Sequence, residues 1–401
     1  MRIIKLGKKI NIKKRILVVF EELQIGGSTT SLISLLNNID YQQFDVDLLL
    51  YRNSGDFDCK LPKELNILKE ANVGSKFLKF TKSLFYGDFF KSLYFGFKTE
   101  NKIKFNKQAL SYVRVTNSRR IKKIYDVAIG FQEGWANNYV ALKSKAHKKI
   151  GWIHPDPKDS KTDYNIDRKV YNTLDTIVLV SKQCNKNFKT IYPKYGSKSL
   201  YIPNILSQDY IRELSKVEVN DILVDPNKIN LVTVCRIDFK SKGLDRAVKA
   251  FGKIINRTDV MNLCWYIIGD GIDMTKLKTM IKENNLDDYI KVLGSKNNPL
   301  PYVKKMDLFF LPSRYEGKPM AVTESLMLGI PAIVTKYASA NEQINHGIDG
   351  IVINNDIESI MEILLEVNMN FDYFKKMKDR LIFKDYSNLE ALKQIYKLID
   401  N

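Results

Sequence analysis

Short apolar runs recur along the whole chain, and their regular spacing is the strongest constraint on its fold. In the second half they occupy 230–235, 263–268, 289–293, 307–311, 331–335 and 350–353. In the first half they occupy 15–20, 44–51, 125–131, 148–153, 175–180 and 199–203. Apolar strands that alternate with helix-length amphipathic segments are typical of parallel sheets covered on both faces. We therefore predict an α/β protein of two doubly wound, Rossmann-like domains that face a cleft, with ligands at the carboxyl ends of the strands.

A proline-bounded stretch without a strong strand signal, 203–230, marks the boundary between the two predicted domains. The 401 residues are enough for two separate cores. We place an N-terminal, acceptor-side domain at 1–205 and a C-terminal, nucleotide-sugar-binding domain at 206–385. A helix is expected over 386–401, and it can return to the N-terminal domain.

The formal net charge of +19 predicts attraction to nucleic acid, an acidic membrane surface or phosphorylated substrates. Lysine and arginine alternate with phenylalanine and tyrosine over 75–123, which interrupts the first domain as an insertion. This segment fits either an amphipathic helix packed on its own domain or a surface that dips into an anionic leaflet. Nucleic acid is the weaker alternative, because no ribonucleoprotein signature or zinc-finger spacing is present.

The remaining composition points to a cytoplasmic protein. No run of about 18 apolar residues is present, and the basic start lacks a signal-peptide core and cleavage site. The four cysteines are scattered without a C-x-x-C pair, which fits a reducing compartment and argues against a zinc site. We expect a cytoplasmic protein that associates peripherally with the inner face of the plasma membrane.

The stretch "SRYEGKPMAVTESLMLGIPAIVT" at 313–335 places two glutamates eight positions apart. Glu316 falls on the loop after a buried strand, Pro319 suits the first turn of a helix, and Glu324 falls inside that helix. Gly329 suits the position after the helix end. The free N–H groups of a helix N-terminus attract phosphate, and carboxylates bind paired hydroxyls. This order of groups complements a nucleoside diphosphate sugar.

The same stretch resembles the E-x7-E motif of glycosyltransferase family 4, the retaining enzymes of GT-B fold that include bacterial polysaccharide transferases. The resemblance implies that Glu316 holds the hydroxyls of the donor sugar and that Glu324 binds the ribose. It also implies that Arg236 and Lys242, at the start of "RIDFKSKGLDRAVKAF", stabilise the leaving diphosphate. We expect Lys242-Gly243 to open a helix. His154 matches an active-site histidine that contacts the sugar or acceptor.

The resemblance extends to further donor-binding positions. A glycine-rich loop follows the first strand, with Ser28 or Thr29 as the cap of the next helix, and "IIGDG" at 267–271 ends in a Gly-x-Gly turn. The expected donor-binding residues are Gly26, Gly27, Gly269, Gly271, Leu293, Gly317, Lys318, Met320, Ala321 and Glu324. Lys318 and Pro319 stand where many relatives have an aromatic residue and a glycine, which leaves the donor sugar open. Ser181 is expected to cap a helix and to have only a structural role.

The resemblance implies a retaining transferase, and we expect it to move a hexose from a uridine diphosphate sugar to a glycan or lipid-linked acceptor of bacterial cell-surface polysaccharide. No cofactor and no essential metal are expected, because the "DVD" at 45–47 lies inside an alternating strand. Two other classes stay open. A GT-B sugar-nucleotide epimerase would convert the donor without an acceptor, and a nucleic-acid-binding protein would be indifferent to Glu316→Ala.

Overall fold

The structure, a computed structural model, describes residues 13–24, 26–53, 61–72, 102–160, 164–255 and 261–400. Most of the predicted basic and aromatic insertion, from 75 to 101, lies outside the described residues. The chain divides into two compact units. Unit 1 comprises Met1–Gln24, Leu35–Ile153 and Thr162–Val178. Unit 2 comprises Ile25–Ser34, His154–Lys161 and Leu179–Asn401.

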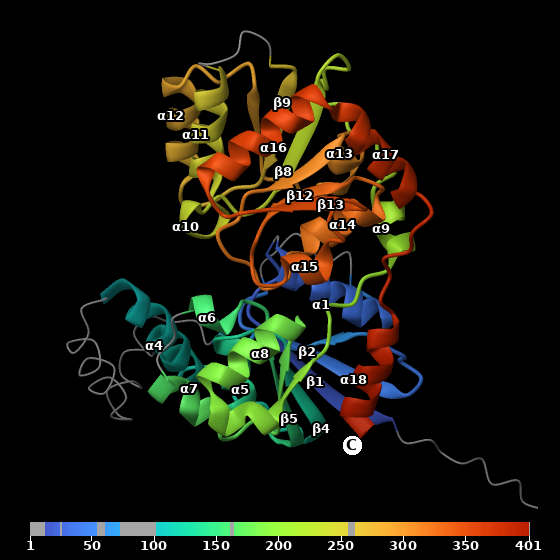
Figure 1. The fold of residues 1–401 in the computed structure, drawn as a ribbon. Coiled ribbons are helices and arrows are strands. Elements are labelled where there is room, and N and C mark those ends of the chain that lie inside the picture. Colours follow the sequence, from blue (N-terminus) through green and yellow to red (C-terminus); the bar gives the residue numbers. More distant parts are fainter. Residues whose placement is uncertain are drawn as a thin grey trace, which may run out of the picture. The chain divides into compact units, whose positions relative to one another are not determined.

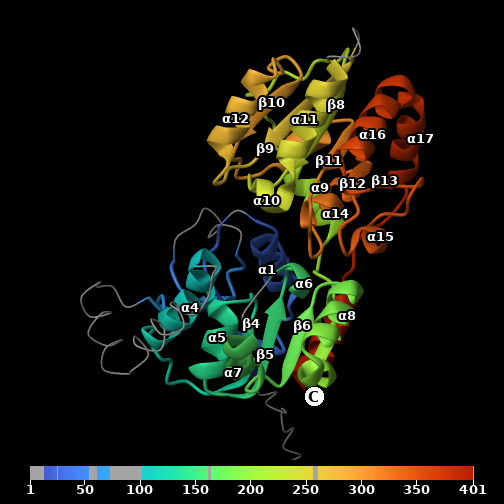
Figure 2. The same ribbon diagram turned by 60° about the vertical axis from the view of Figure 1, so that its left-hand side comes forward.

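A seven-stranded sheet forms the core of the first half of the chain. Its strands are β1 (Lys14–Phe20), β2 (Phe44–Leu50), β3 (Asn66–Ile67), β4 (Tyr125–Gly130), β5 (Ala146–Ile153), β6 (Thr176–Leu179) and β7 (Ser199–Tyr201). They follow the order β3-β2-β1-β4-β5-β6-β7, and β1 pairs in parallel with both β2 and β4. Helices α4 (Lys102–Thr116), α5 (Trp135–Leu142) and α7 (Tyr164–Tyr171) of unit 1 pack together along one side of this sheet (Figures 1 and 2).

Unit 2 contains a six-stranded sheet in which every neighbouring pair is parallel. Its strands are β8 (Ile229–Val234), β9 (Leu263–Ile268), β10 (Ile290–Gly294), β11 (Leu308–Leu311), β12 (Ala332–Thr335) and β13 (Gly350–Ile353). Their order, β10-β9-β8-β11-β12-β13, is that of a Rossmann fold, with the topological switch between β8 and β11. Ligands of such sheets bind at the carboxyl ends of the strands beside this switch.

The other helices are short to medium in length. They are α1 (Gly27–Asn38), α6 (Pro157–Ser160), α8 (Lys182–Ile191), α9 (Gln208–Leu214), α10 (Phe239–Lys242), α11 (Leu244–Ile255), α12 (Met274–Glu283), α13 (Leu300–Lys304), α14 (Met320–Met327), α15 (Ala340–Gln343), α16 (Ile357–Met369), α17 (Phe371–Leu381) and α18 (Glu390–Asp400). A 3-10 helix spans Pro193–Lys198. No helix among the described residues combines the length and the apolar character that crossing a bilayer requires.

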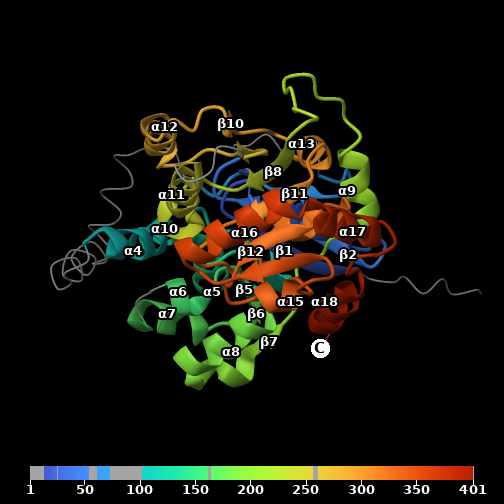
Figure 3. The same ribbon diagram turned by 45° about the horizontal axis from the view of Figure 1, so that its top comes forward.

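Hydrophobic cores cover both faces of the six-stranded sheet. Leu231 of β8 and its neighbour Val232 point to opposite faces, and both are fully buried. Helices α11, α12 and α16 pack on the face of Leu231, and α13 packs on the face of Val232 (Figure 3). Helix α14 also packs on the face of Val232. This double cover explains why the strands have continuous apolar sequences instead of alternating ones.

The structure contains all twelve strands that the apolar runs predict. Strand β3 was not predicted, because its two residues are exposed and too few to produce a periodic signal. Ser181 caps α8 as expected, since its Oγ accepts from the N–H of Cys184 at 3.0 Å. Gly329 follows the end of α14 with φ 78°.

Three helix boundaries differ from the expectations. Lys242 ends the short helix α10 instead of opening a helix, and Gly243 (φ 64°) separates α10 from α11. Pro319 is the extended residue before α14 instead of a member of its first turn. Helix α1 begins at Gly27, so Ser28 and Thr29 lie inside its first turn and neither is the residue before the helix. Each boundary is determined by a loop residue next to the helix. Hydrophobic periodicity gives no information about such residues.

Candidate active site

Glu316 and Lys242 lie in direct contact at the switch point of the six-stranded sheet. Lys242 Nζ is 2.5 Å from Glu316 Oε1, and the two side chains are only 17% and 11% exposed. Ser313 Oγ donates to the same Oε1 at 2.6 Å. Among the described residues, no group donates to Oε2 of Glu316. The carboxylate is therefore held through one oxygen, and its other oxygen is available to a ligand.

Lys242 keeps its positive charge in this site. Burial opposes the charged form, but the neighbouring Glu316 outweighs it, and the pKa of Lys242 lies above its ordinary value. Arg236 acts in the opposite sense on this pKa, which places it within electrostatic range of Lys242. An ammonium group has three donors, and Glu316 accepts from Lys242 without exhausting them. Lys242 can therefore bind a phosphate oxygen without leaving Glu316.

The loops that carry Lys242 and Glu316 are locked together beside this pair. Arg314 binds Asp245 in a bidentate ion pair, with N–O distances of 2.6 and 2.7 Å. Arg246 Nη2 donates to the carbonyl of Pro312 at 3.0 Å. A Cβ at Gly243 would overlap that same carbonyl oxygen, so only glycine allows the two loops to approach this closely. These contacts hold the ammonium group of Lys242 against the carboxylate of Glu316.

Ser313 is a buried anchor for Glu316. Its side chain has no solvent exposure, and its carbonyl oxygen accepts from Thr335 Oγ1 of β12. Because β11 and β12 are neighbours in the sheet, this bond ties the loop to two strands at once. The hydroxyl that contacts Glu316 is therefore rigidly placed.

Arg236 extends from the carboxyl end of β8 into solvent. Its side chain is 71% exposed and lies 3.6 Å from the carboxylate of Asp238. The Gly-x-Gly turn after β9 supports the loop from behind, because a Cβ at Gly269 or Gly271 would overlap a carbonyl oxygen of that loop. The N–H of Ile237 also donates to the carbonyl of Asp270 of the turn at 2.8 Å. These two predicted glycines thus position the arginine loop.

Cys235, between β8 and Arg236, does not provide a nucleophile. Burial raises the pKa of its thiol to about 12, although Lys242 and Arg236 oppose this. The thiol is therefore neutral near physiological pH.

The N-terminus of α14 is held by a network that the sequence did not indicate. Gln343 Nε2 donates to the carbonyl of Pro319 at 2.8 Å and to Thr323 Oγ1 at 2.7 Å. Gln343 Oε1 in turn accepts from the hydroxyl of Tyr337 at 2.8 Å. Glu324 lies one turn into α14 and is 9% exposed. The helix tip is thus a rigid feature next to Glu316.

Predicted residues from the first half of the chain meet this helix tip within unit 2. Gly317 packs so closely on the carbonyl of His154 that a Cβ there would overlap it. A Cβ at Gly27, the first residue of α1, would lie 3.2 Å from Met320 Cγ, at the start of α14. The structure therefore brings the His154 loop, the glycine-rich loop and the Glu316 loop together.

The other predicted donor-binding residues have the following environments. Gly26 is exposed, and a Cβ there would meet no atom within 4 Å. Burial lowers the pKa of Lys318, while Glu342 opposes the shift and Lys182 adds to it. Leu293, in β10, packs partly buried against the core on the α14 side of the sheet, as does Ala321.

No group of three or more potential metal ligands occurs among the residues that the structure describes. Asp47 of the "DVD" is 1% exposed and accepts from Tyr125, Lys123 and Asn66 at 2.6–2.9 Å. These bonds hold β2, and they occupy the carboxylate inside the protein.

Sequence reasoning identified Glu316, Lys242 and Arg236 as candidates but missed the residues that hold them. Ser313 had a usable signal, because it lies three residues before Glu316 in a turn after a strand. Arg314 and Asp245 had none, since their pairing joins two separate βα loops.

The fold and the strand order define the class: two Rossmann-like parallel sheets, the GT-B fold. The crystal structure of Anabaena Alr3699/HepE in complex with UDP and glucose is similar over 97% of this chain and 100% of that chain. Its TM-score is 0.71 at 14% sequence identity. Residues 216–382 match the family model described as glycosyl transferases group 1.

Curated proteins of similar sequence are also named as glycosyltransferases. The chain is 34% identical over 116 residues to the Escherichia coli UDP-Gal:alpha-D-GlcNAc-diphosphoundecaprenol alpha-1,3-galactosyltransferase, a match over 28% of this chain and 30% of that one. It is 23% identical over 216 residues, 52% of each chain, to an uncharacterized glycosyltransferase of Methanocaldococcus jannaschii. The chain thus spans about half the length of the M. jannaschii relative and 30% of the length of the E. coli relative.

Proposed function

We propose that this protein is a retaining glycosyltransferase that moves a hexose from a UDP-sugar to a glycan or lipid-linked acceptor in cell-surface polysaccharide synthesis. The observation that carries the proposal is the state of Glu316: Oε1 is fixed by Lys242 and Ser313, and none of the residues that the structure describes donates to Oε2. A carboxylate presented in this way, beside a helix N-terminus and two cations, suits a sugar attached to a diphosphate.

The donor half of the reaction follows from these positions. Glu316 Oε2 accepts from a hydroxyl of the donor sugar and stabilises positive charge that develops at the anomeric carbon. Arg236 and Lys242 bind the diphosphate, which gains charge as the glycosidic bond breaks. Glu324 binds the ribose hydroxyls. The acceptor hydroxyl attacks the anomeric carbon from the same face as the departing diphosphate, whose oxygen accepts the hydroxyl proton, so the reaction retains the anomeric configuration and requires no general base.

A UDP donor is supported by what the similar proteins bind or use. The Anabaena structure holds UDP and glucose, and the name of the E. coli relative specifies UDP-Gal and a diphosphoundecaprenol acceptor. Both support a uridine nucleotide as donor, and the name of the E. coli relative alone supports an acceptor carried on a lipid diphosphate. No metal and no cofactor enter the proposed reaction.

The acceptor side is assigned to the sheet of unit 1, where charged side chains gather at the carboxyl ends of β1 and β2. Arg114 Nη1 lies 2.5 Å from Glu21 Oε1, and Arg52 lies 3.6 Å from Glu22. Both arginines lie over the ring of Tyr51, at 5.5 and 5.7 Å. Carboxylates, guanidinium groups and aromatic rings together are suited to hydroxylated sugars.

The test is a panel of sugar nucleotides incubated with the full chain, with and without a lipid-linked diphosphate acceptor. The released nucleoside diphosphate and the glycosylated acceptor are both measured. We expect UDP release from one UDP-sugar, a product with retained anomeric configuration, and full activity in the presence of EDTA. Conversion of the donor to a second sugar nucleotide without acceptor would identify an epimerase. Salt-sensitive nucleic-acid binding with no turnover would contradict the proposal.

A further inference from the structure

The peptide group that joins Pro319 to Met320 is held from one side by a buried glutamine. Gln343, the last residue of α15, is 8% exposed, and its Nε2 donates to the carbonyl of Pro319 at 2.8 Å. A trans peptide group is planar, and its C=O and N–H point in opposite directions. By holding the carbonyl of Pro319, Gln343 therefore also fixes the direction of the Met320 N–H, on the far side of the same peptide group.

The N–H of Met320 is the first donor at the tip of α14. Pro319 has no N–H and no side-chain cap, and no described residue accepts from the N–H of Met320. A Cβ at Gly27 would lie 4.0 Å from Met320 N, so the glycine leaves space beside this nitrogen. In the proposed function the tip of α14 faces the donor diphosphate, and an N–H placed there donates to a phosphate oxygen.

The direction of the Gln343 amide is determined by its partners. The carbonyl of Pro319 can only accept, so Nε2 faces it, and the same Nε2 donates to Thr323 Oγ1 at 2.7 Å. Oε1 then accepts from the hydroxyl of Tyr337 at 2.8 Å. Burial raises the pKa of Tyr337 well above its ordinary value and Glu316 adds to the rise, so this hydroxyl stays protonated and can donate. A reversed amide would lose these bonds.

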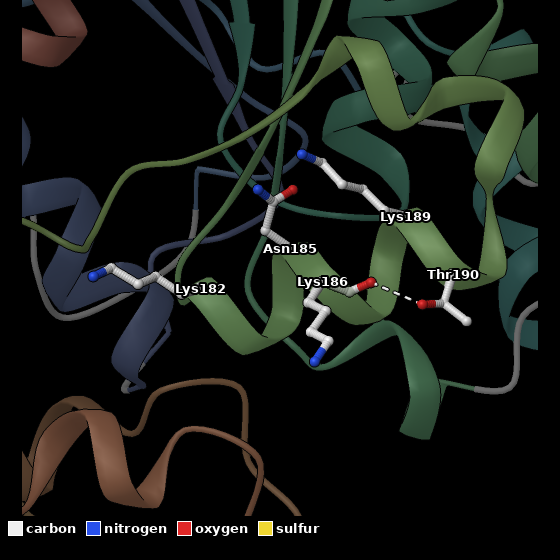
Figure 4. Close-up of a pocket in the computed structure, with 5 residues that line it drawn as sticks. All are labelled: Lys182, Asn185, Lys186, Lys189 and Thr190. Carbon is white, nitrogen blue, oxygen red and sulfur yellow. Dashed lines mark hydrogen bonds between the residues drawn. The ribbon is translucent and has the colours of Figure 1, made fainter.

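The backbone that carries Gln343 is anchored as well. Glu342, one residue earlier, accepts from the backbone N–H groups of Lys182 and Gln183, at 3.0 and 2.7 Å. These are the first two residues of α8, and Figure 4 shows Lys182 at this end of the helix. Gln343 is therefore a fixed point from which the tip of α14 can be aligned.

We propose that Gln343 is a positioning residue of the donor site, which directs the N–H of Met320 toward the diphosphate of the donor. Tyr337 supports it by holding the amide in the required direction. The inference rests on the proposed function, because Gln343 acts on the diphosphate only through the helix tip. A side chain that only filled this space could be apolar, since a buried amide requires a partner for each of its polar groups.

The test is calorimetric titration of UDP into the full chain and into Gln343→Leu, which has a similar volume but lacks the hydrogen bonds to Pro319, Thr323 and Tyr337. We expect UDP affinity about tenfold weaker in the variant, because a phosphate oxygen loses an aligned N–H. Uridine has no phosphate, and its affinity, measured by ligand-observed NMR, should be the same in both proteins. An equal loss for UDP and uridine would indicate a general disturbance of the site and would overturn the proposal.

Gln208→Leu is the matched control. Gln208 is 5% exposed and also bonds through both ends of its amide. Its Nε2 donates to the carbonyl of Lys384 at 3.3 Å, and its Oε1 accepts from the N–H of Tyr386 at 2.9 Å. Both leucine variants should have a lower free energy of unfolding, but Gln208→Leu should bind UDP as the unmodified chain does. Unchanged UDP affinity in Gln343→Leu, or equal losses in both variants, would overturn the proposal.

Tyr337→Phe is a milder variant, because it removes one hydroxyl from the same network. We expect UDP affinity about threefold weaker, with no additional loss when the change is combined with Gln343→Leu, since Tyr337 acts through Gln343. Additive losses would contradict this dependence. The two proposals also fail differently. An unmodified chain that does not bind UDP would contradict the proposed function, whereas UDP binding that Gln343→Leu and Tyr337→Phe both retain would overturn only the role of Gln343.

Discussion

Glu316 is the residue on which the proposed chemistry depends most. Glu316→Gln keeps the size of the side chain but removes the charge that stabilises the anomeric carbon. We expect kcat to fall about 100- to 1,000-fold, the magnitude typical of a lost electrostatic contact to a transition state. UDP affinity should change little, because Arg236 and Lys242 remain. Full turnover in this variant would contradict the role of Glu316.

The same variant has a pH-dependent effect on stability. The folded-state pKa of Lys242 is raised because Glu316 outweighs burial. The stabilisation from this pair is therefore complete below the pKa of an unfolded lysine, about 10.4, and is lost as pH rises through the folded value. The difference in unfolding free energy between the unmodified chain and Glu316→Gln should shrink above that pH. A difference that stays constant from neutral to strongly alkaline pH would contradict the ion pair.

Ser313 is a positioning residue, because it acts only through Glu316. Ser313→Ala should lower kcat about tenfold, the value of one hydrogen bond to a charged group, with unchanged UDP affinity. Ser325→Ala is the matched control, since Ser325 is equally buried but donates only to the carbonyl of Val322. Similar kcat losses in both variants would indicate a general packing effect.

The sequence singled out individual candidate residues but not the contacts between them. The E-x7-E spacing predicted a role for Glu316, and the resemblance to glycosyltransferase family 4 implied roles for Lys242 and Arg236. Their arrangement, with Lys242 on Glu316 and Arg236 71% exposed, depends on how two βα loops pack. Local patterns report only the segment that contains them, so a contact across 74 residues of chain leaves no signal.

At the scale of elements, Gly243 joins α10 to α11 and allows the Pro312 loop to approach. Gly243→Ala should cost about 3 kcal/mol or more in unfolding free energy, from backbone strain at φ 64° together with the clash. Gly294 has a similar φ of 72° but open space around it. Gly294→Ala should therefore cost only about 1–2 kcal/mol. Equal losses in chemical denaturation would show that the loop contact contributes nothing.

Elements with a continuous apolar sequence could be predicted, and elements defined by the packing of loops could not. All twelve apolar runs became strands, because burial on both sheet faces imposes a continuous apolar sequence. The exposed edge strand β3 and the four-residue helix α10 have no such constraint. Lys242 was therefore placed at the wrong end of a helix.

At the scale of the whole molecule, the charge of +19 and the basic insertion at 75–123 lead us to expect association with anionic membranes. The purified chain should float with phosphatidylglycerol vesicles at low salt and dissociate as salt rises. Failure to bind such vesicles at low salt would contradict the expected association with anionic membranes.

The central claim is that a donor diphosphate binds beside α14, on Arg236 and Lys242 and next to Glu316. Calorimetric titration of UDP into Arg236→Ala tests it most directly, because that exposed side chain contributes little to the fold. Lys240→Ala, an exposed lysine of α10 outside the site, is the control. We predict UDP affinity at least about tenfold weaker in Arg236→Ala and unchanged in the control. Equal UDP affinity in all three proteins would contradict the claim.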